Sequence, residues 1–70
     1  MRTYNPFIRR SAEIVEYARL HNLSIMDAAD QFITSNHWHR TAELMQDYRE
    51  YIKLCRGKSL DEIARLTDGE

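Results

Sequence analysis

The stretch that decides the fold is residues 38–57, "WHRTAELMQDYREYIKLCRG". Trp38, Met45 and Ile52 recur every seven residues, which is the spacing of one face of a helix. Further large or inward-facing side chains follow the same spacing or widen the apolar face: Thr41, Leu44, Tyr48, Tyr51 and Cys55. Gly57 suits the left-handed residue that ends many helices. The pattern therefore predicts a long helix over residues 38–56.

Two helices are predicted before it. Asn5 and Pro6 form an N-cap followed by a first-turn proline, which predicts a helix over residues 6–21. Its buried stripe would hold Phe7, Ile8, Ser11, Ile14, Val15 and Ala18. Ser24 and Asp27 resemble a capping box and predict a second helix over residues 24–35, with Asn36 as its left-handed end. The apolar face of that helix would be Ile25, Ala28, Ala29, Phe32 and Ile33.

A last short helix is predicted after Gly57. The motif "SLDE", from Ser59 to Glu62, is a capping box. The inward face would be Leu60, Ile63, Ala64 and Leu66, until Asp68 and Gly69 end the helix. The predicted fold is therefore all-α: a compact four-helix domain with helices at 6–21, 24–35, 38–56 and 59–67. The connections are short, so residues 1–70 are expected to form one domain.

Composition excludes several functions. The chain has 70 residues, 43% of them hydrophobic and 30% charged, which is ordinary for a folded domain. The formal net charge of −1 argues against a surface built mainly to bind phosphates, so a nucleic-acid partner is not expected. No apolar run reaches the length of a signal peptide or membrane span, and a single cysteine cannot form an internal disulfide. The sequence is therefore expected to act in the cytoplasm.

The segment "SNHWHR", residues 35–40, holds the groups that most resemble a metal site. On a helix His37 and His39 would point about 200° apart, and no second ligand pair has metal-binding spacing. Cys55 falls on the inward face, where it is expected to be a small buried hydrophobe. There is no glycine-rich phosphate loop and no nucleophile beside a base. We therefore expect no metal, no cofactor, no small-molecule substrate and no enzymatic activity.

Aromatic content favours a protein-binding role. Tryptophan and tyrosine dominate interface hot spots, and a bundle of this size has few interior places for large rings. Tyr51, at the margin of the apolar face, is expected to be exposed, whereas Trp38 and Tyr48 are expected in the core. The predicted partner-binding residues are Trp38, Arg40, Asp47 and Tyr51. A chain with so small a core is also a candidate for self-association.

The alternative is a small DNA-binding transcriptional regulator. Residues 24–44 place Ala29 where the first helix of a helix-turn-helix would need a small residue, but Ile33 and His39 fall where the turn glycine and the apolar anchor should be. The segment "SLDEIARLTDGE", residues 59–70, resembles only the first helix of such a unit. If the alternative holds, the phosphate contacts would be Arg40, Arg49, Lys53 and Arg56.

Three runs carry a resemblance to a known family: "EIVEYARLHNLSIMDAADQF", "YREYI" and "LDEIARL". They resemble a group of short, uncharacterised, all-helical bacterial proteins that are often encoded beside putative ADP-ribosylating toxins. The matching positions are Leu23, Ser24, Ala28 and Phe32, and the similarity spans about residues 13–66. The resemblance implies an antitoxin or accessory role. The group has glycine and small residues near the second loop, where this chain has Asn36, His37 and Trp38.

Overall fold

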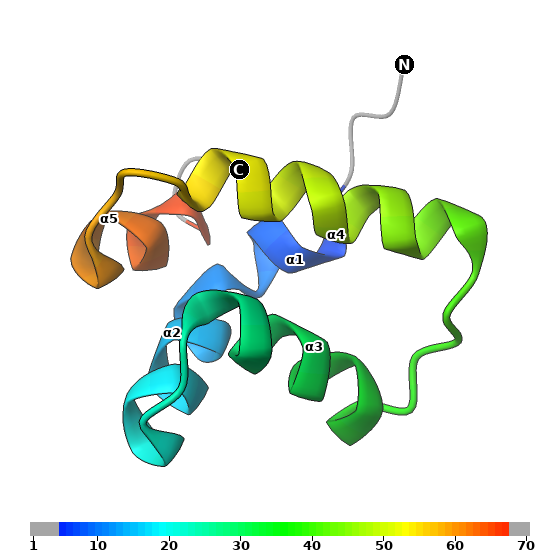
Figure 1. The fold of residues 1–70 in the computed structure, drawn as a ribbon, viewed down its shortest axis with the longest axis horizontal. Coiled ribbons are helices and arrows are strands. Elements are labelled where there is room, and N and C mark those ends of the chain that lie inside the picture. Colours follow the sequence, from blue (N-terminus) through cyan, green and yellow to red (C-terminus); the bar gives the residue numbers. More distant parts are fainter. Residues whose placement is uncertain (1–4, 68–70) are drawn as a thin grey trace.

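The computed structural model describes residues 5–67, and within that part the chain is helical and has no strand. Its elements are α1 (Pro6–Arg9), α2 (Ser11–His21), α3 (Ile25–Ser35), α4 (Ala42–Cys55), α5 (Leu60–Ala64) and the 3-10 turn η1 (Arg65–Thr67). Figure 1 shows α4 along one side of the molecule, α2 and α3 on the other, and α5 at the end of α4. The all-α prediction is confirmed.

Three predicted N-caps are present. The Asn5 side chain accepts a hydrogen bond from the Phe7 amide at 2.9 Å, with Pro6 in the first turn. Ser24 accepts from the Asp27 amide at 3.2 Å. Ser59 and Glu62 form the full capping box that the sequence predicts. Each cap satisfies an amide that has no partner inside its helix, so these helix starts are fixed by residues within one turn.

The predicted helix over residues 6–21 is broken at Arg10, which has φ −106° and ψ 19°. Thr67, from the far end of the described chain, bridges this break. Its hydroxyl accepts from the Ala12 amide at 2.9 Å and donates to the Ile8 carbonyl at 3.4 Å. A distant residue thus takes the place of a local cap, and the break turns α1 away from α2 (Figure 1).

The third helix begins at Ala42, not at residue 38 as predicted. Thr41 is its N-cap and accepts from the Leu44 amide at 3.1 Å. Before it, His37 has φ 58°, so His37 rather than Asn36 is the left-handed residue, and the Trp38 amide donates to the Ile33 carbonyl at 3.1 Å. Residues 38–40 are therefore a connection that crosses from α3 to α4.

The core is drawn from all five helices. The stripe predicted for residues 6–21 is buried except for Ile8, and the predicted apolar face of α3 is buried except for Ile25; both isoleucines are partly buried. The buried hydrophobic residues are Phe7, Ile14, Val15, Ala18, Ala28, Ala29, Phe32, Ile33, Tyr51, Cys55 and Ile63. Cys55 is buried as predicted. Several larger side chains pack partly buried against this cluster, among them Leu44, Met45, Tyr48 and Ile52.

The orientation of α4 differs from the prediction. Tyr51 is 0% exposed and Asp47 is 2% exposed, whereas both were expected at the surface. The predicted seam counted Trp38 and Thr41 as helical positions, and neither lies in α4. Within α4 itself the inward face centres on Asp47, Tyr51 and Cys55, so Tyr51 occupies the middle of that face and not its margin.

A buried hydrogen-bond chain joins α4 to α2 and α5. Ser11 Oγ lies 2.7 Å from Tyr51 Oη and 2.6 Å from the Ile63 carbonyl oxygen. A serine hydroxyl has one proton, which goes to the Ile63 carbonyl because a carbonyl can only accept. The Tyr51 hydroxyl therefore donates to Ser11. Burial raises the pKa of the Tyr51 phenol, so it stays protonated and able to donate.

We predict that Ser11→Ala destabilises the protein more than Tyr51→Phe does. Tyr51→Phe removes one hydrogen bond and should cost about 1 kcal/mol. Ser11→Ala removes the hydrogen bonds that the Ser11 hydroxyl makes with the Tyr51 hydroxyl and with the Ile63 carbonyl, and should cost roughly 2–3 kcal/mol. Urea unfolding followed by circular dichroism measures both. Ser35→Ala, at an exposed position, is the matched control and should change little. The reverse order of the two losses would contradict the role of Ser11 as the partner of both groups.

The last helix is shorter than the predicted 59–67. It ends at Ala64 and continues as η1 to Thr67. The predicted ending at Asp68 and Gly69 lies outside the described residues. The capping box at its start has an electrostatic consequence, because the Ser59 amide and hydroxyl both contact Glu62 Oε1, at 3.0 and 3.3 Å. The hydrogen bond from the Ser59 amide, followed by that from its hydroxyl, lowers the pKa of the Glu62 carboxyl.

The lowered pKa predicts how the contribution of Glu62 to stability varies with pH. A carboxyl whose folded pKa is depressed stabilises the protein above its ordinary pKa, about 4.3, and loses that contribution as pH falls through the folded value. Wild type should therefore unfold at higher urea than Glu62→Gln at pH 7, and the difference should shrink at about pH 3. A difference that is the same at both pH values would contradict the capping role of the charge.

Candidate binding groove

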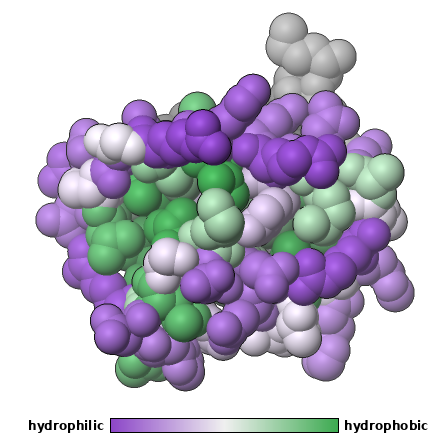
Figure 2. All heavy atoms as spheres, viewed as in Figure 1, coloured by the Kyte–Doolittle hydropathy of each residue, from purple (hydrophilic) through white to green (hydrophobic). Residues whose placement is uncertain are grey.

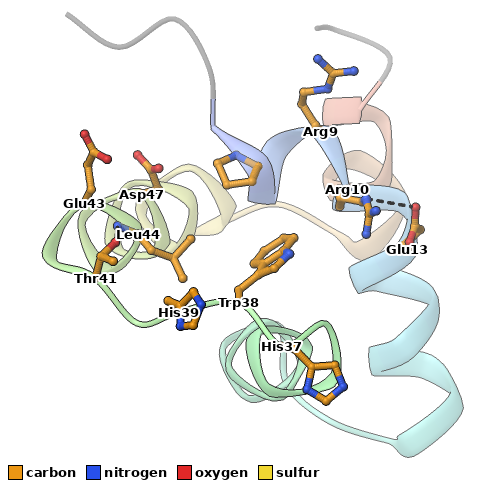
Figure 3. Close-up of a pocket in the computed structure, with 11 residues that line it drawn as sticks. Arg9, Arg10, Glu13, His37, Trp38, His39, Thr41, Glu43, Leu44 and Asp47 are labelled. Atoms are coloured by element: carbon orange, nitrogen blue, oxygen red, sulfur yellow. Dashed lines mark hydrogen bonds and ion pairs between the residues drawn. The ribbon is translucent and has the colours of Figure 1, made fainter.

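An open groove of about 700 Å³ lies between α1, the start of α2, the α3–α4 connection and the first turns of α4 (Figure 3). Elements far apart in the sequence therefore meet at one site. The residues that line it are Pro6, Arg9, Arg10, Glu13, His37, Trp38, His39, Thr41, Glu43, Leu44 and Asp47. We call this site the Trp38 groove.

Trp38 lies in the middle of the groove and is half-buried. Its ring makes edge contacts with Phe7 and with Phe32, at centroid distances of 5.6 Å for both and interplanar angles of 83° and 80°. Such contacts fix the orientation of the indole beyond the burial of its area. Part of a rigid aromatic surface is thus presented to whatever enters the groove.

The connection that carries Trp38 is held on both sides. Arg40 binds back to α3, with Nη1 2.9 Å from Asp30 Oδ1 and Nη2 3.1 Å from Thr34 Oγ1. On the other side Arg10 donates to Asn36 Oδ1 at 3.4 Å, and Asn36 donates to the Phe32 carbonyl at 2.9 Å. The connection is therefore fixed by side chains of α3 and by Arg10 at the break between α1 and α2.

Charged residues of both signs form the rim. Arg10 is 3.6 Å from Glu13, the pair drawn as a dashed line in Figure 3, and its guanidinium lies 5.9 Å from the centre of the Phe32 ring. Arg9 and Glu43 lie at the outer edge of the same groove. In this view His39 lies beside Trp38 and Leu44, whereas His37 points away from the Trp38 ring. The groove is an aromatic floor within a polar rim.

The structure brings together only two of the four predicted partner-binding residues. Trp38 and Asp47 both line the groove, although Asp47 is buried and its backbone carbonyl accepts from the Asn5 side chain at 3.1 Å. Arg40 does not line it, because its guanidinium is bound to α3. Tyr51 cannot reach a partner, since its ring is in the core and stacks at 5.9 Å on Phe7.

Sequence reasoning missed most of the groove. Arg9, Arg10 and Glu13 lie outside the buried stripe predicted for a continuous helix over residues 6–21, and the break at Arg10 is what brings them beside the connection. His39 was treated as the first turn of a helix. The one signal that could have found the groove is the Thr41 cap, because a helix starting at Ala42 leaves Trp38 in a loop.

The predicted phosphate contacts do not form one surface. Arg49, Lys53 and Arg56 are all exposed, and their i, i+4, i+7 spacing places them on one stripe of α4 and its C-cap. Arg40 is apart from them, paired with Asp30.

Candidate metal ligands do not assemble among residues 5–67. No group of three or more histidine, cysteine or acidic residues in this part of the chain is arranged to hold a metal ion. The argument that His37 and His39 diverge on a helix does not apply, because neither lies in one. Burial raises the pKa of the Cys55 thiol and so disfavours the reactive thiolate.

Comparison of the chain with protein-family models, curated proteins and solved structures gives no match. Of the helices in the described residues, none combines the length and apolar character needed to cross a membrane.

We predict that Trp38→Ala costs about 2–4 kcal/mol of stability, since a half-buried ring loses its contacts with Phe7 and Phe32 but was never fully removed from water. Trp38→Phe should lose less than half as much stability as Trp38→Ala does. Urea unfolding followed by circular dichroism measures both losses. A loss below about 0.5 kcal/mol for Trp38→Ala, the range of ordinary surface changes, would show that the ring contacts do not hold the connection.

Proposed function

We propose that the protein is a small protein-binding module and that the Trp38 groove is its binding surface. The observation that carries the proposal is the half-buried indole, held rigidly by Phe7 and Phe32 at the floor of an open groove. Binding energy at protein interfaces concentrates on such preorganised aromatic groups, which lose little conformational freedom on binding.

The groove favours a partner segment with one apolar side chain and polar flanks. Leu44 and Trp38 offer apolar contact at the centre, while Arg9, Glu13 and Glu43 surround it with charge of both signs. An apolar residue would cover the exposed part of the indole, and polar groups on either side of it would meet the rim. Rim charges contribute more to orientation and rate of association than to affinity.

The biological role belongs to the same proposal. The resemblance of residues 13–66 to bacterial proteins encoded beside toxins supports an inhibitor that binds and regulates a protein in the cytoplasm, as an antitoxin or a phage-type inhibitor does.

The test is capture of a partner from the native cell by the tagged wild-type chain, followed by measurement of affinity with the purified partner. His39→Ala and Leu44→Ser alter the groove and should each weaken binding by roughly tenfold or more. Glu16→Ala, at an exposed position of α2 that does not line the groove, should bind as wild type does. Equal affinity of all four proteins would show that the partner binds elsewhere.

The alternative function, a DNA-binding regulator, is tested by binding to duplex DNA. The exposed stripe of Arg49, Lys53 and Arg56 is the observation that favours it. A gel shift at low salt that disappears steeply with added salt, and is lost in Lys53→Ala, would support DNA binding. If no gel shift occurs at low salt, the alternative is ruled out.

A further inference from the structure

A second surface lies between α3 and α4, and it is apolar at its centre. Met26 is 50% exposed, and Met45, Tyr48 and Ile52 are only partly buried. The last three share one side of α4 by their spacing, and the hydrogen bond from Tyr48 Oη to the Met26 carbonyl, 3.1 Å, shows that this side faces the start of α3. We call these four residues the α3–α4 hollow. Figure 2 shows apolar side chains gathered between α4 and the α2–α3 pair, with hydrophilic residues on either side.

The two walls of the hollow carry opposite charges. On α4, Arg49 and Arg56 flank Ile52 at i−3 and i+4, and both are exposed. Neither has an ion pair with any other residue of the described chain, 5–67. One wall is therefore basic.

The α3 wall is acidic. Asp27 follows Met26 directly and is exposed, and Asp30 lies one turn further on, paired with Arg40. Burial has the largest effect on the pKa of the Tyr48 phenol and raises it. The negative charges of Asp30 and then Asp27 raise it further, and the positive charge of Arg40 lowers it by less. The acidic wall is therefore close enough to act on a residue inside the hollow.

This arrangement is self-complementary. A two-fold axis through the hollow would lay α4 of one copy over α3 of the other, so each basic wall would meet the acidic wall of the other copy. The dimer would then contain two such pairings, one on each side of a shared apolar centre. A partner of uniform charge would be attracted by one wall and repelled by the other. From these observations we infer that the α3–α4 hollow binds a second copy of this chain in a symmetric dimer.

The dimer surface is separate from the Trp38 groove, so the inference does not rest on the proposed partner binding. None of the four residues of the hollow lines the groove, although Leu44 of the groove lies one turn before Tyr48 of the hollow on α4. The two surfaces are therefore distinct neighbours. Pairing two copies would also enlarge the apolar core available to a chain of 70 residues.

The test is the mass of the full chain by sedimentation equilibrium over a wide concentration range, with two charge reversals. Arg49→Glu should weaken the dimer at least about tenfold, because glutamate would then face Asp27 of the other copy, and Asp27→Lys should do the same because lysine would face Arg49. An equimolar mixture of the two variants should dimerise as wild type does, since each wall then meets its opposite. Lys58→Glu and Glu16→Lys, charge reversals at exposed positions outside the hollow, are the controls and should dimerise normally.

Circular dichroism should show that every variant retains its helices. Asp27 lies in the first turn of α3, and its replacement removes a favourable charge there; if Asp27→Lys fails to fold, Arg56→Glu with Arg49→Ala tests the basic wall alone and should give monomers. A wild-type chain that stays monomeric at the highest concentration overturns the inference. So does a mixture of folded Arg49→Glu and Asp27→Lys chains that remains monomeric.

Discussion

The arrangement of the helices depends on one buried interaction, the contact of Ser11 with Tyr51 and the Ile63 carbonyl. Its three members come from α2, α4 and α5, and the two hydrogen bonds are 2.7 and 2.6 Å long. A polar group that is removed from water must find a partner, so each helix can adopt only the rotation that keeps these bonds. With Tyr51 fixed in the centre, its neighbours Asp47 and Cys55 also face inward, and Arg49 and Lys53 must face outward.

The break between α1 and α2 follows from the same constraint. Ser11 starts α2 beside Tyr51, while Phe7, one turn earlier, stacks on the Tyr51 ring and meets the edge of Trp38. Thr67 satisfies backbone groups on both sides of the break. The consequence for function is the groove, because α1, turned at Arg10, stands opposite the α3–α4 connection with Trp38 between them.

The two surfaces of the chain suit different tasks. The Trp38 groove is small, rigid and aromatic, with charges of both signs at its rim, and suits a single inserted side chain of a partner. The α3–α4 hollow has one acidic and one basic wall, a pattern that is matched by an occupant with the same pattern reversed. They share no residue, so a dimer carries two grooves, and binding to a partner with two sites would gain from their linkage.

The sequence by itself determined the helical class, the buried stripes of α2 and α3, and the capped starts at Asn5, Ser24 and Ser59. These depend on residues within one or two turns of each other, where capping atoms and helical spacing act directly. It also identified Trp38 as a residue of interest and Cys55 as a buried one. It did not determine the start of α4, because the seven-residue spacing of Trp38 and Thr41 with later residues matched a helix that the local Thr41 cap excludes.

Only the tertiary structure decided that Tyr51 and Asp47 are buried, that Arg40 is bound to α3, and that Arg9, Arg10 and Glu13 face Trp38. Each of these outcomes depends on groups that lie far apart in the sequence, such as Ser11 for Tyr51, Asn5 for Asp47 and Thr67 for the break at Arg10. Spacing along one helix says which residues share a face. It does not determine which part of that face meets the core, because this depends on hydrogen bonds and ring contacts with other helices.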